Sequence, residues 1–321
     1  MAEENSLVFG PVPSRRLGRS LGLDLVPLKT CSYDCIYCQL GRTTRHTIER
    51  REWVNPETVL EQLQTRLASE PDYITLSGSG EPTLHSGVGE LIGRIKNMTD
   101  IPVAVLTNGS LLWQEETRNN LMQADLVVPS LDAGSQRMFR YVNRPAPELT
   151  FDQMLAGLTA FRYEYDGQYW LEVFLLGGVT DIEAEVRTIG AAVQQIQPDR
   201  VQLNTVSRPP AESYAYPVPK ERMEHIAESL PGRTEVIADY RGTHDLPDFA
   251  AQREDVLAML KRRPCTLEDI AGGLGLHRNE VVKYVEHLSA EGLVNASTHG
   301  RRKYYSTRQE KPDRLKTATD D

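Results

Sequence analysis

The sequence lacks the two features that would send a chain out of the cytoplasm. Residues 1–7 read MAEENSL, without the basic segment and apolar stretch that form a secretory signal, and no run of about 18 apolar residues occurs that would span a membrane. We therefore expect a cytoplasmic protein with no membrane partner. The 321 residues, 40% of them hydrophobic and 25% charged, suffice for one large domain and a small one.

Cysteine is scarce, and its placement matters more than its number. Only four cysteines are present, and three of them, Cys31, Cys35 and Cys38, fall within eight residues. A domain stabilised by disulfides needs an oxidising compartment, which the sequence gives no reason to expect. The cysteine cluster therefore predicts a metal site.

Charge is unevenly distributed along the chain. The formal net charge is -9, but residues 1–250 hold 23 Lys and Arg against 34 Asp and Glu, whereas residues 251–308 hold ten against seven. The large N-terminal region is acidic and the region after it is mildly basic. Because phosphate neutralisation drives nucleic-acid affinity, an acidic protein approaches nucleic acid at an electrostatic cost.

Short β-branched runs alternate with segments of helical periodicity over the first 240 residues. Alternating strands and helices imply parallel strands joined by right-handed crossovers, hence an α/β fold. Six units are too few for a closed eight-fold barrel, so we predict a partial (β/α)6 barrel with its chemistry at the C-terminal ends of the strands. Strands are expected at residues 21–26, 73–77, 103–107, 126–130, 170–176 and 201–206, and helices after Asn55 and Pro56 and at residues 151–165 and 182–196.

The alternation stops at residues 241–247, a polar segment that we interpret as a linker. After it, helices are predicted at residues 253–262, 267–271 (capped by Thr266) and 278–290, and two strands at 293–296 and 303–306, which is the order of a winged helix. The predicted domains are therefore a core at 1–245, a C-terminal winged-helix domain at 250–308 and a charged, disordered tail at 309–321.

The three clustered cysteines follow the first predicted strand with C-x3-C-x2-C spacing, in the sequence TCSYDCIYCQL. Thiolates are soft ligands that suit zinc or an iron-sulfur cluster. A structural zinc ion would need a fourth ligand, for which His46 and Cys265 are the candidates. On a four-iron cluster, three ligands leave one iron open to a cofactor or substrate, and this second interpretation indicates catalysis.

This spacing, with Tyr37 directly before the last cysteine, resembles the signature of the radical S-adenosylmethionine (SAM) superfamily. The resemblance implies a 4Fe-4S cluster on Cys31, Cys35 and Cys38, with SAM chelating the open iron. It further implies that the reduced cluster cleaves SAM into methionine and a 5'-deoxyadenosyl radical, which abstracts hydrogen from a substrate. The implied partners are SAM, an unknown substrate and a reductase or a flavodoxin- or ferredoxin-type electron donor. For Tyr37, packing is the alternative to cofactor contact.

The sequence after the second predicted strand, SGSGEPTL at residues 77–84, resembles the GGE motif of that superfamily, with Ser79 where a glycine is common. The resemblance implies that Gly80 lets the backbone approach the cofactor and that Glu81 pairs with the methionyl ammonium group. The alternative is an ordinary turn from strand to helix, with Glu81 near a helix N-terminus.

Polar residues also follow the third, fourth and sixth strands. The triplets TNG (residues 107–109) and SLD (residues 130–132) resemble positions at which the superfamily contacts the nucleoside or the substrate. Asn108, Ser130 and Asp132 are therefore candidate SAM contacts, although Asn108 and Asp132 are also turn-forming residue types. Arg208 is a candidate for bidentate binding of a carboxylate of cofactor or substrate, or else a surface residue.

The sequence leaves two interpretations open for each of two further charged features. Arg15, Arg16 and Arg19 precede the first strand as either an anion-binding segment or a solvated basic stretch. Glu172 lies among apolar residues of the fifth strand, where it needs a buried partner or an outward-facing position.

The run VFGPVPSRRLGRSLGLDLVP at residues 8–27 resembles the iron-sulfur oxidoreductases related to the tRNA wyosine-forming enzymes. Those wyosine enzymes carry further cysteines for a second cluster, which Cys265 alone cannot supply, so the resemblance does not transfer the tRNA activity. The same shortage argues against methylthiotransferases and against peptide-maturing enzymes with auxiliary clusters.

The leading hypothesis is a radical SAM enzyme that cleaves SAM for hydrogen abstraction from an unknown substrate. The alternatives are a tRNA-modifying radical SAM enzyme and a cluster-sensing regulator whose winged helix binds DNA. Arg301, Arg302 and Lys303 are candidate phosphate contacts of the winged helix. Protein docking or substrate presentation is the other role that we predict for this domain.

Overall fold

The computed structural model describes residues 7–14, 16–207, 210–237, 253–274, 278–300 and 302–307. Its strands are β1 (Val8–Ser14), β2 (Gly18–Leu23), β3 (Thr30–Cys31), β4 (Arg45–His46), β5 (Tyr73–Leu76), β6 (Val103–Thr107), β7 (Leu126–Pro129), β8 (Gln168–Leu175), β9 (Arg200–Thr205), β10 (Thr234–Val236), β11 (Val294–His299) and β12 (Arg302–Thr307). Its helices are α1 (Pro56–Arg66), α2 (Val88–Met98), α3 (Glu115–Leu121), α4 (Gln136–Val142), α5 (Phe151–Glu164), α6 (Glu183–Ile196), α7 (Lys220–Ser229), α8 (Arg253–Arg262), α9 (Leu267–Leu274) and α10 (Arg278–Ala290), with short 3-10 helices η1 (Leu67–Ser69) and η2 (Pro82–Leu84).

A mostly parallel sheet forms the centre of the fold. Its strand order is β1-β2-β5-β6-β7-β8-β9-β10, in which β1 and β2 are antiparallel and all other neighbours are parallel. Within the described residues, β1 and β10 each have one neighbour, so the sheet is open. All six predicted strands are present, and the expectation of an α/β fold is confirmed. The count of six was incomplete, because β1 and β10 were not predicted.

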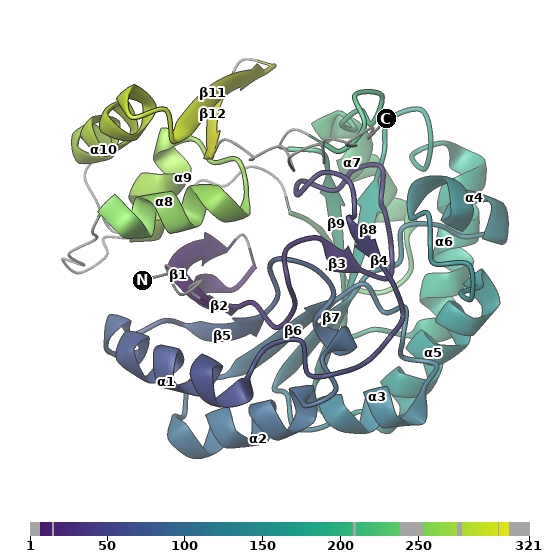
Figure 1. The fold of residues 1–321 in the computed structure, drawn as a ribbon. Helices are drawn as coiled ribbons and strands as arrows, with labels where there is room; N and C mark the ends of the chain where they lie inside the picture. The colour runs from purple at the N-terminus through teal and green to yellow at the C-terminus, as the bar shows by residue number, and fades with distance from the viewer. Residues whose placement is uncertain are drawn as a thin grey trace, which may run out of the picture.

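The two faces of the sheet differ in what covers them. Helices α1, α2, α3, α5 and α6 lie along the outer side (Figure 1). Because side chains alternate along a strand, Val103 and Val105 of β6 join the main core, whereas Ala104 between them faces the other way. Ala104 belongs to a small separate cluster with Leu17, Leu126, Val128 and Trp170.

Local sequence signals define where the helices begin. The Asn55 side chain accepts a hydrogen bond from Glu57 N at 2.8 Å, and Pro56 occupies the first turn, as predicted. Thr150 and Gln153 form a reciprocal capping box at the start of α5. Thr266 Oγ1 accepts from Asp269 N at 3.1 Å, which confirms the cap predicted for α9.

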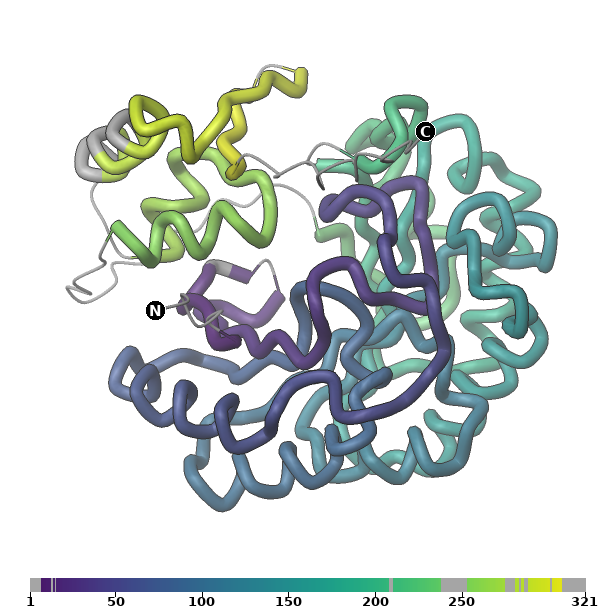
Figure 2. The backbone as a smooth tube through the Cα atoms, in the orientation of Figure 1, coloured from purple at the N-terminus to yellow at the C-terminus, as the bar shows by residue number. Residues whose placement is uncertain are grey.

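Helices α8, α9 and α10 and the antiparallel pair of β11 and β12 form what we term the C-terminal unit, the described residues from 253 to 307. It lies against the β1–β2 hairpin, as Figures 1 and 2 both show. Val12 of β1 shares a buried apolar cluster with Val256, Met259 and Leu260 of α8. The predicted linker at 241–247 and tail at 309–321 lie outside the described residues, and the domain boundaries and winged-helix assignment stay predictions.

No helix in the described ranges combines the length and the apolar character that a bilayer span requires.

Two helical glycines differ in how closely another part of the chain approaches them. A Cβ at Gly157 in α5 would lie 2.3 Å from Trp113 N, whereas one at Gly93 in α2 would lie 3.0 Å from the flexible end of Gln123. We expect Gly157→Ala to lower the free energy of unfolding by about 2 kcal/mol, because backbone must move. Gly93→Ala should raise that energy by up to about 1 kcal/mol through helix propensity.

Denaturant titrations of the two variants and the parent chain test this pair of expectations. A gain in stability from Gly157→Ala equal to that from Gly93→Ala would contradict the close approach of α5 to residues 112 and 113.

Candidate cofactor site

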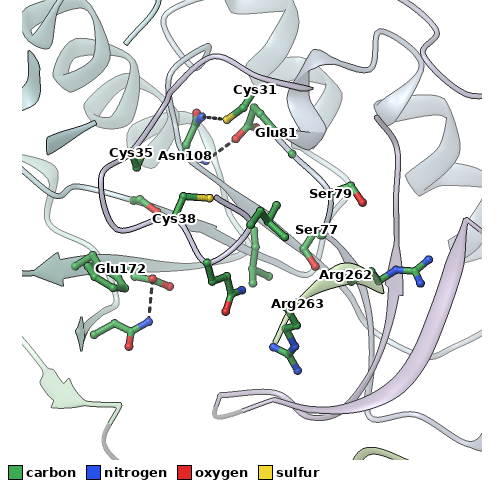
Figure 3. Close-up of a pocket in the computed structure, with 18 of the residues that line it drawn as sticks. Cys31, Cys35, Cys38, Ser77, Ser79, Glu81, Asn108, Glu172, Arg262 and Arg263 are labelled. Atoms are coloured by element: carbon green, nitrogen blue, oxygen red, sulfur yellow. Dashed lines mark hydrogen bonds between the residues drawn. The ribbon is translucent and has the colours of Figure 1, made fainter. Parts of the chain in front are cut away.

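A cavity of about 430 Å³ lies at the C-terminal ends of the parallel strands. The loop at residues 31–38 and the turn at residues 77–81, which we call the 77–81 turn, form part of its wall. Figure 3 shows the three clustered cysteines to one side of this cavity and Arg262 and Arg263 of the C-terminal unit to the other. The sequence predicted the position of the cavity but not the contribution of the C-terminal unit to its lining.

All three clustered cysteines line the cavity, and polar hydrogens point at two of the sulfur atoms. Cys31 Sγ accepts from Tyr33 N and from Asn108 Nδ2, each at 3.5 Å, and Cys35 Sγ accepts from Asn143 Nδ2 at 3.5 Å. N–H donors of this kind favour thiolate ligands and tune iron-sulfur clusters.

Burial makes these thiols costly to ionise without a compensating cation. It raises the pKa of Cys31, with a further contribution from Glu81, to about 12, and it raises the pKa values of Cys35 and Cys38 as well. A cysteine binds a metal as its thiolate, so a bound metal has to supply the positive charge that displaces the thiol proton.

Three thiols in one loop fit an iron-sulfur cluster, and the two candidates for a fourth zinc ligand have other contacts. In the part of the chain that the structure describes, no group of three His, Cys, Asp or Glu side chains converges on a position for a single metal ion. His46 Nε2 lies 3.0 Å from Ser32 O, and Cys265 is buried in the apolar cluster of the C-terminal unit. Each of these two side chains thus has a partner other than the sulfur atoms of the 31–38 loop.

Glu81 holds together the loops that follow β5 and β6. Its Oε1 accepts from Thr83 N (3.0 Å), Thr83 Oγ1 (2.7 Å) and Thr107 Oγ1 (2.6 Å), and its Oε2 accepts from Asn108 N (2.7 Å). Burial raises the pKa of the Glu81 carboxyl, and these hydrogen bonds oppose the shift. The strand-to-helix turn with Glu81 at its start is present, since Glu81 caps η2. Its pairing with a methionyl ammonium group stays a prediction.

Backbone contacts to residues 29 and 30 help to hold Ser79 and Gly80 in the 77–81 turn. A Cβ at Gly80 would lie 1.9 Å from Thr30 O, so only glycine fits beside the strand that begins the cysteine loop. Ser79 is buried, and its carbonyl accepts from Lys29 N at 2.6 Å. Both Ser79 and Gly80 line the cavity, next to the position predicted for the cofactor.

Asp132 and Tyr37 join the cysteine loop to β8. The Tyr37 hydroxyl donates to Asp132 Oδ2, which also accepts from Asn143 Nδ2 at 2.7 Å, while Asp132 Oδ1 accepts from Phe174 N at 3.1 Å. The Tyr37 ring stacks on Phe174 with centroids 3.9 Å apart. Burial raises the pKa of Asp132 to about 6. These contacts support the packing alternative for Tyr37, which nevertheless lines the cavity.

Asn108 and Ser130 also lie on the cavity wall. Asn108 Nδ2 donates to Ser32 Oγ at 2.9 Å and Asn108 Oδ1 accepts from Ser110 N at 2.9 Å, so this residue makes its turn as well as contacting Cys31. The remaining predicted contact, Arg208, lies outside the described residues.

Arg16 and Glu172, whose environments the sequence left open, contact each other in the structure. The Arg16 guanidinium forms an ion pair with Glu172 inside the cavity, where the two side chains are 10% and 17% exposed. Glu172 Oε1 also accepts from Asn204 Nδ2 at 3.2 Å. Of the two alternatives that the sequence left open for Glu172, the structure shows the buried partner, and Arg16 is not part of a solvated stretch.

The sequence missed Thr107 and Asp24 as residues that organise the site. Thr107 was recognised only as the first residue of the TNG triplet, and Asp24 only as part of the 8–27 run. Asp24 Oδ1 accepts from Ser79 N at 2.8 Å. The sequence around Asp24 gives only a weak indication of this role, because the partners of its carboxylate are 55 or more residues away along the chain.

A model of the radical SAM superfamily matches residues 25–187 of the chain, about half of its length. A UPF0026 protein of Methanocaldococcus jannaschii is 37% identical over 276 residues, which cover 83% of this chain and 85% of that protein. A protein of Brachyspira hyodysenteriae named GTPase Obg is 40% identical over 292 residues, but this chain spans only 43% of its length.

Two solved structures share the fold at low sequence identity. A radical SAM methyltransferase from Sphaerobacter thermophilus has a TM-score of 0.52 and 18% identity, with 68% of this chain and 66% of that chain covered. SuiB of Streptococcus suis, bound to S-adenosylmethionine, has a TM-score of 0.50 and 15% identity, with 72% and 53% covered.

The hydrogen bonds of Glu81 generate a prediction about stability. Glu81→Ala should lower the free energy of unfolding by about 3 kcal/mol, because it leaves buried donors of Thr83, Thr107 and Asn108 without an acceptor. Glu81→Gln should cost less, since one oxygen remains. Glu90→Ala, which removes an exposed carboxylate on α2, is the matched control and should leave stability unchanged.

Denaturant unfolding of the cluster-free protein measures all three variants without any ligand. If Glu81→Ala were as stable as Glu90→Ala, the carboxylate would not organise the loops, and a role in ligand contact alone would remain.

Proposed function

Because the chain belongs to the radical SAM superfamily, we propose that it is an enzyme that cleaves SAM reductively at a 4Fe-4S cluster held by Cys31, Cys35 and Cys38. The proposal rests on one observation. A single cavity is lined by the three thiols, the 77–81 turn and the loops after β6 and β7. When bound, a reduced cluster would supply the one electron that breaks the bond between the sulfonium sulfur and the 5' carbon of SAM, with methionine as the leaving group and a 5'-deoxyadenosyl radical as the other product.

The residues of the chain would bind and orient the cofactor. Glycine at position 80 lets backbone groups of the 77–81 turn approach a ligand, and Ser79, Asn108 and Ser130 present polar atoms to the same space. In this proposal Glu81 and Asp132 act mainly by holding these loops, since their oxygens already accept hydrogen bonds. The ion pair of Arg16 and Glu172 would border the substrate.

The C-terminal unit has the element order of a winged helix, which we infer as its fold, within the proposed boundaries of 250–308. Its contribution of Met259, Arg262 and Arg263 to the cavity supports a role at the reaction site, such as substrate presentation, over an independent DNA-binding role. The likeness to tRNA wyosine-forming enzymes, the external electron donor and the cytoplasmic location stay predictions.

Reconstitution with iron and sulfide in the absence of oxygen tests the cluster. We expect about four iron atoms per chain, and loss of iron binding in Cys31→Ser, Cys35→Ser and Cys38→Ser. Cys265→Ala is the control, since Cys265 lies in the C-terminal apolar cluster, and it should retain the iron. Zinc in place of iron at the 31–38 loop would contradict the proposal.

Turnover tests the chemistry. With dithionite as reductant, the reconstituted protein should convert SAM to methionine and 5'-deoxyadenosine, measured by liquid chromatography and mass spectrometry, and the three Cys→Ser variants should fall to the background of cluster-free protein. An intact cluster without cleavage, together with DNA binding that responds to cluster oxidation, would instead support the regulator hypothesis.

A further inference from the structure

The carboxylate of Asp24 connects the C-terminal unit to the 77–81 turn. Asp24 directly follows β2, and its Oδ1 accepts from Ser79 N at 2.8 Å. Its other oxygen, Oδ2, accepts from Arg262 Nε at 2.9 Å. One carboxylate therefore contacts both the last residue of α8 and the backbone of the turn that borders the cysteine loop.

The link is buried and electrostatically interdependent. The side chains of Arg262 and Asp24 are 11% and 9% exposed. Burial raises the pKa of Asp24 and lowers that of Arg262, and each charge opposes the shift of the other. A single charge left in such a place is strongly destabilising, so the two side chains hold each other in position.

Packing further restricts where the pair can lie. The Arg262 guanidinium lies over the Phe9 ring, 4.2 Å from its centroid. Gly78 has φ of +124°, and a Cβ there would lie 2.2 Å from Asp24 Oδ1, so the carboxylate lies directly against the turn. On the other side of the turn, Lys29 N donates to Ser79 O at 2.6 Å.

We propose that Arg262 is a positioning residue for the cofactor site: by fixing the Asp24 carboxylate, it holds Ser79 and the 77–81 turn in the shape that binds SAM. The C-terminal unit is then part of the binding machinery, although Arg262 acts through Asp24. The identity of the ligand rests on the proposed function, whereas the coupling from Arg262 to the turn does not.

The test compares Arg262→Met with Arg66→Met in the full-length, reconstituted protein. Arg66 forms an ion pair with Asp255 of α8 at 2.8 Å, so its loss removes a contact between the same two parts of the molecule without touching Asp24. Its charge disfavours that of Arg262, so its loss does not weaken the pair of Arg262 and Asp24. Methionine keeps most of the apolar stem of arginine. Equilibrium dialysis with SAM, without reductant, and hydrogen exchange of peptides that contain residues 77–81 are measured on each variant.

Arg262→Met should weaken SAM binding about tenfold, which corresponds to about 1.4 kcal/mol, and should speed amide exchange in the 77–81 turn. Arg66→Met should leave both values at those of the parent, and Arg262→Lys, which keeps a positive donor, should fall between. If Arg262→Met does not fold, the same comparison is made with Arg262→Lys and Arg66→Lys.

Unchanged exchange and unchanged SAM affinity in the Arg262 variants, or equal changes in the Arg66 variants, would overturn the proposal. If the parent protein bound no SAM, the proposed function would fail, but faster exchange in the Arg262 variants alone would still support the coupling.

Discussion

The structure of the site depends on one constraint, that a buried carboxylate must have both oxygens satisfied. Asp24 and Glu81 accept hydrogen bonds from backbone N–H groups of loops at the strand ends, and Asp132 accepts one from Phe174 N within β8. Each carboxylate joins two segments that are distant in the sequence. The polar atoms that line the cavity are thereby held on rigid supports, which a site that orients a cofactor requires.

The same residues give the cavity its electrostatic character. Three partly exposed thiols and two buried carboxylates lie close together. The charge of Glu81 further raises the pKa of Cys31, and that of Asp132 further raises the pKa of Cys35. Such a site is costly to ionise unless a cation balances its negative charge. Iron ions and the sulfonium of SAM both carry positive charge, so pairing with them would offset the cost of ionising the thiols.

The C-terminal unit contributes to the wall of a site that is built on an open sheet. The sheet ends at β1, and the described strands alone leave that edge without a further partner. Helix α8 packs on the β1–β2 hairpin through the cluster that contains Val12, and it brings Arg262 to Asp24. The unit therefore completes a wall that the strands do not provide, which explains why its residues lie next to the 77–81 turn.

The sequence by itself determined the features that depend on neighbours along the chain. The six main strands followed from apolar runs, the caps at Asn55 and Thr266 from short-range hydrogen-bonding types, and the cysteine site from spacing within eight residues. Strand β10 has only three residues and β1 contains two prolines and a glycine, so neither has a clear strand signal. The pairing of Arg16 with Glu172 and of Arg262 with Asp24 was decided by the tertiary structure. The partners are 156 and 238 residues apart, so no local sequence pattern indicates the pairing. The pairs form because an unpaired charge that is buried on folding would be strongly destabilising.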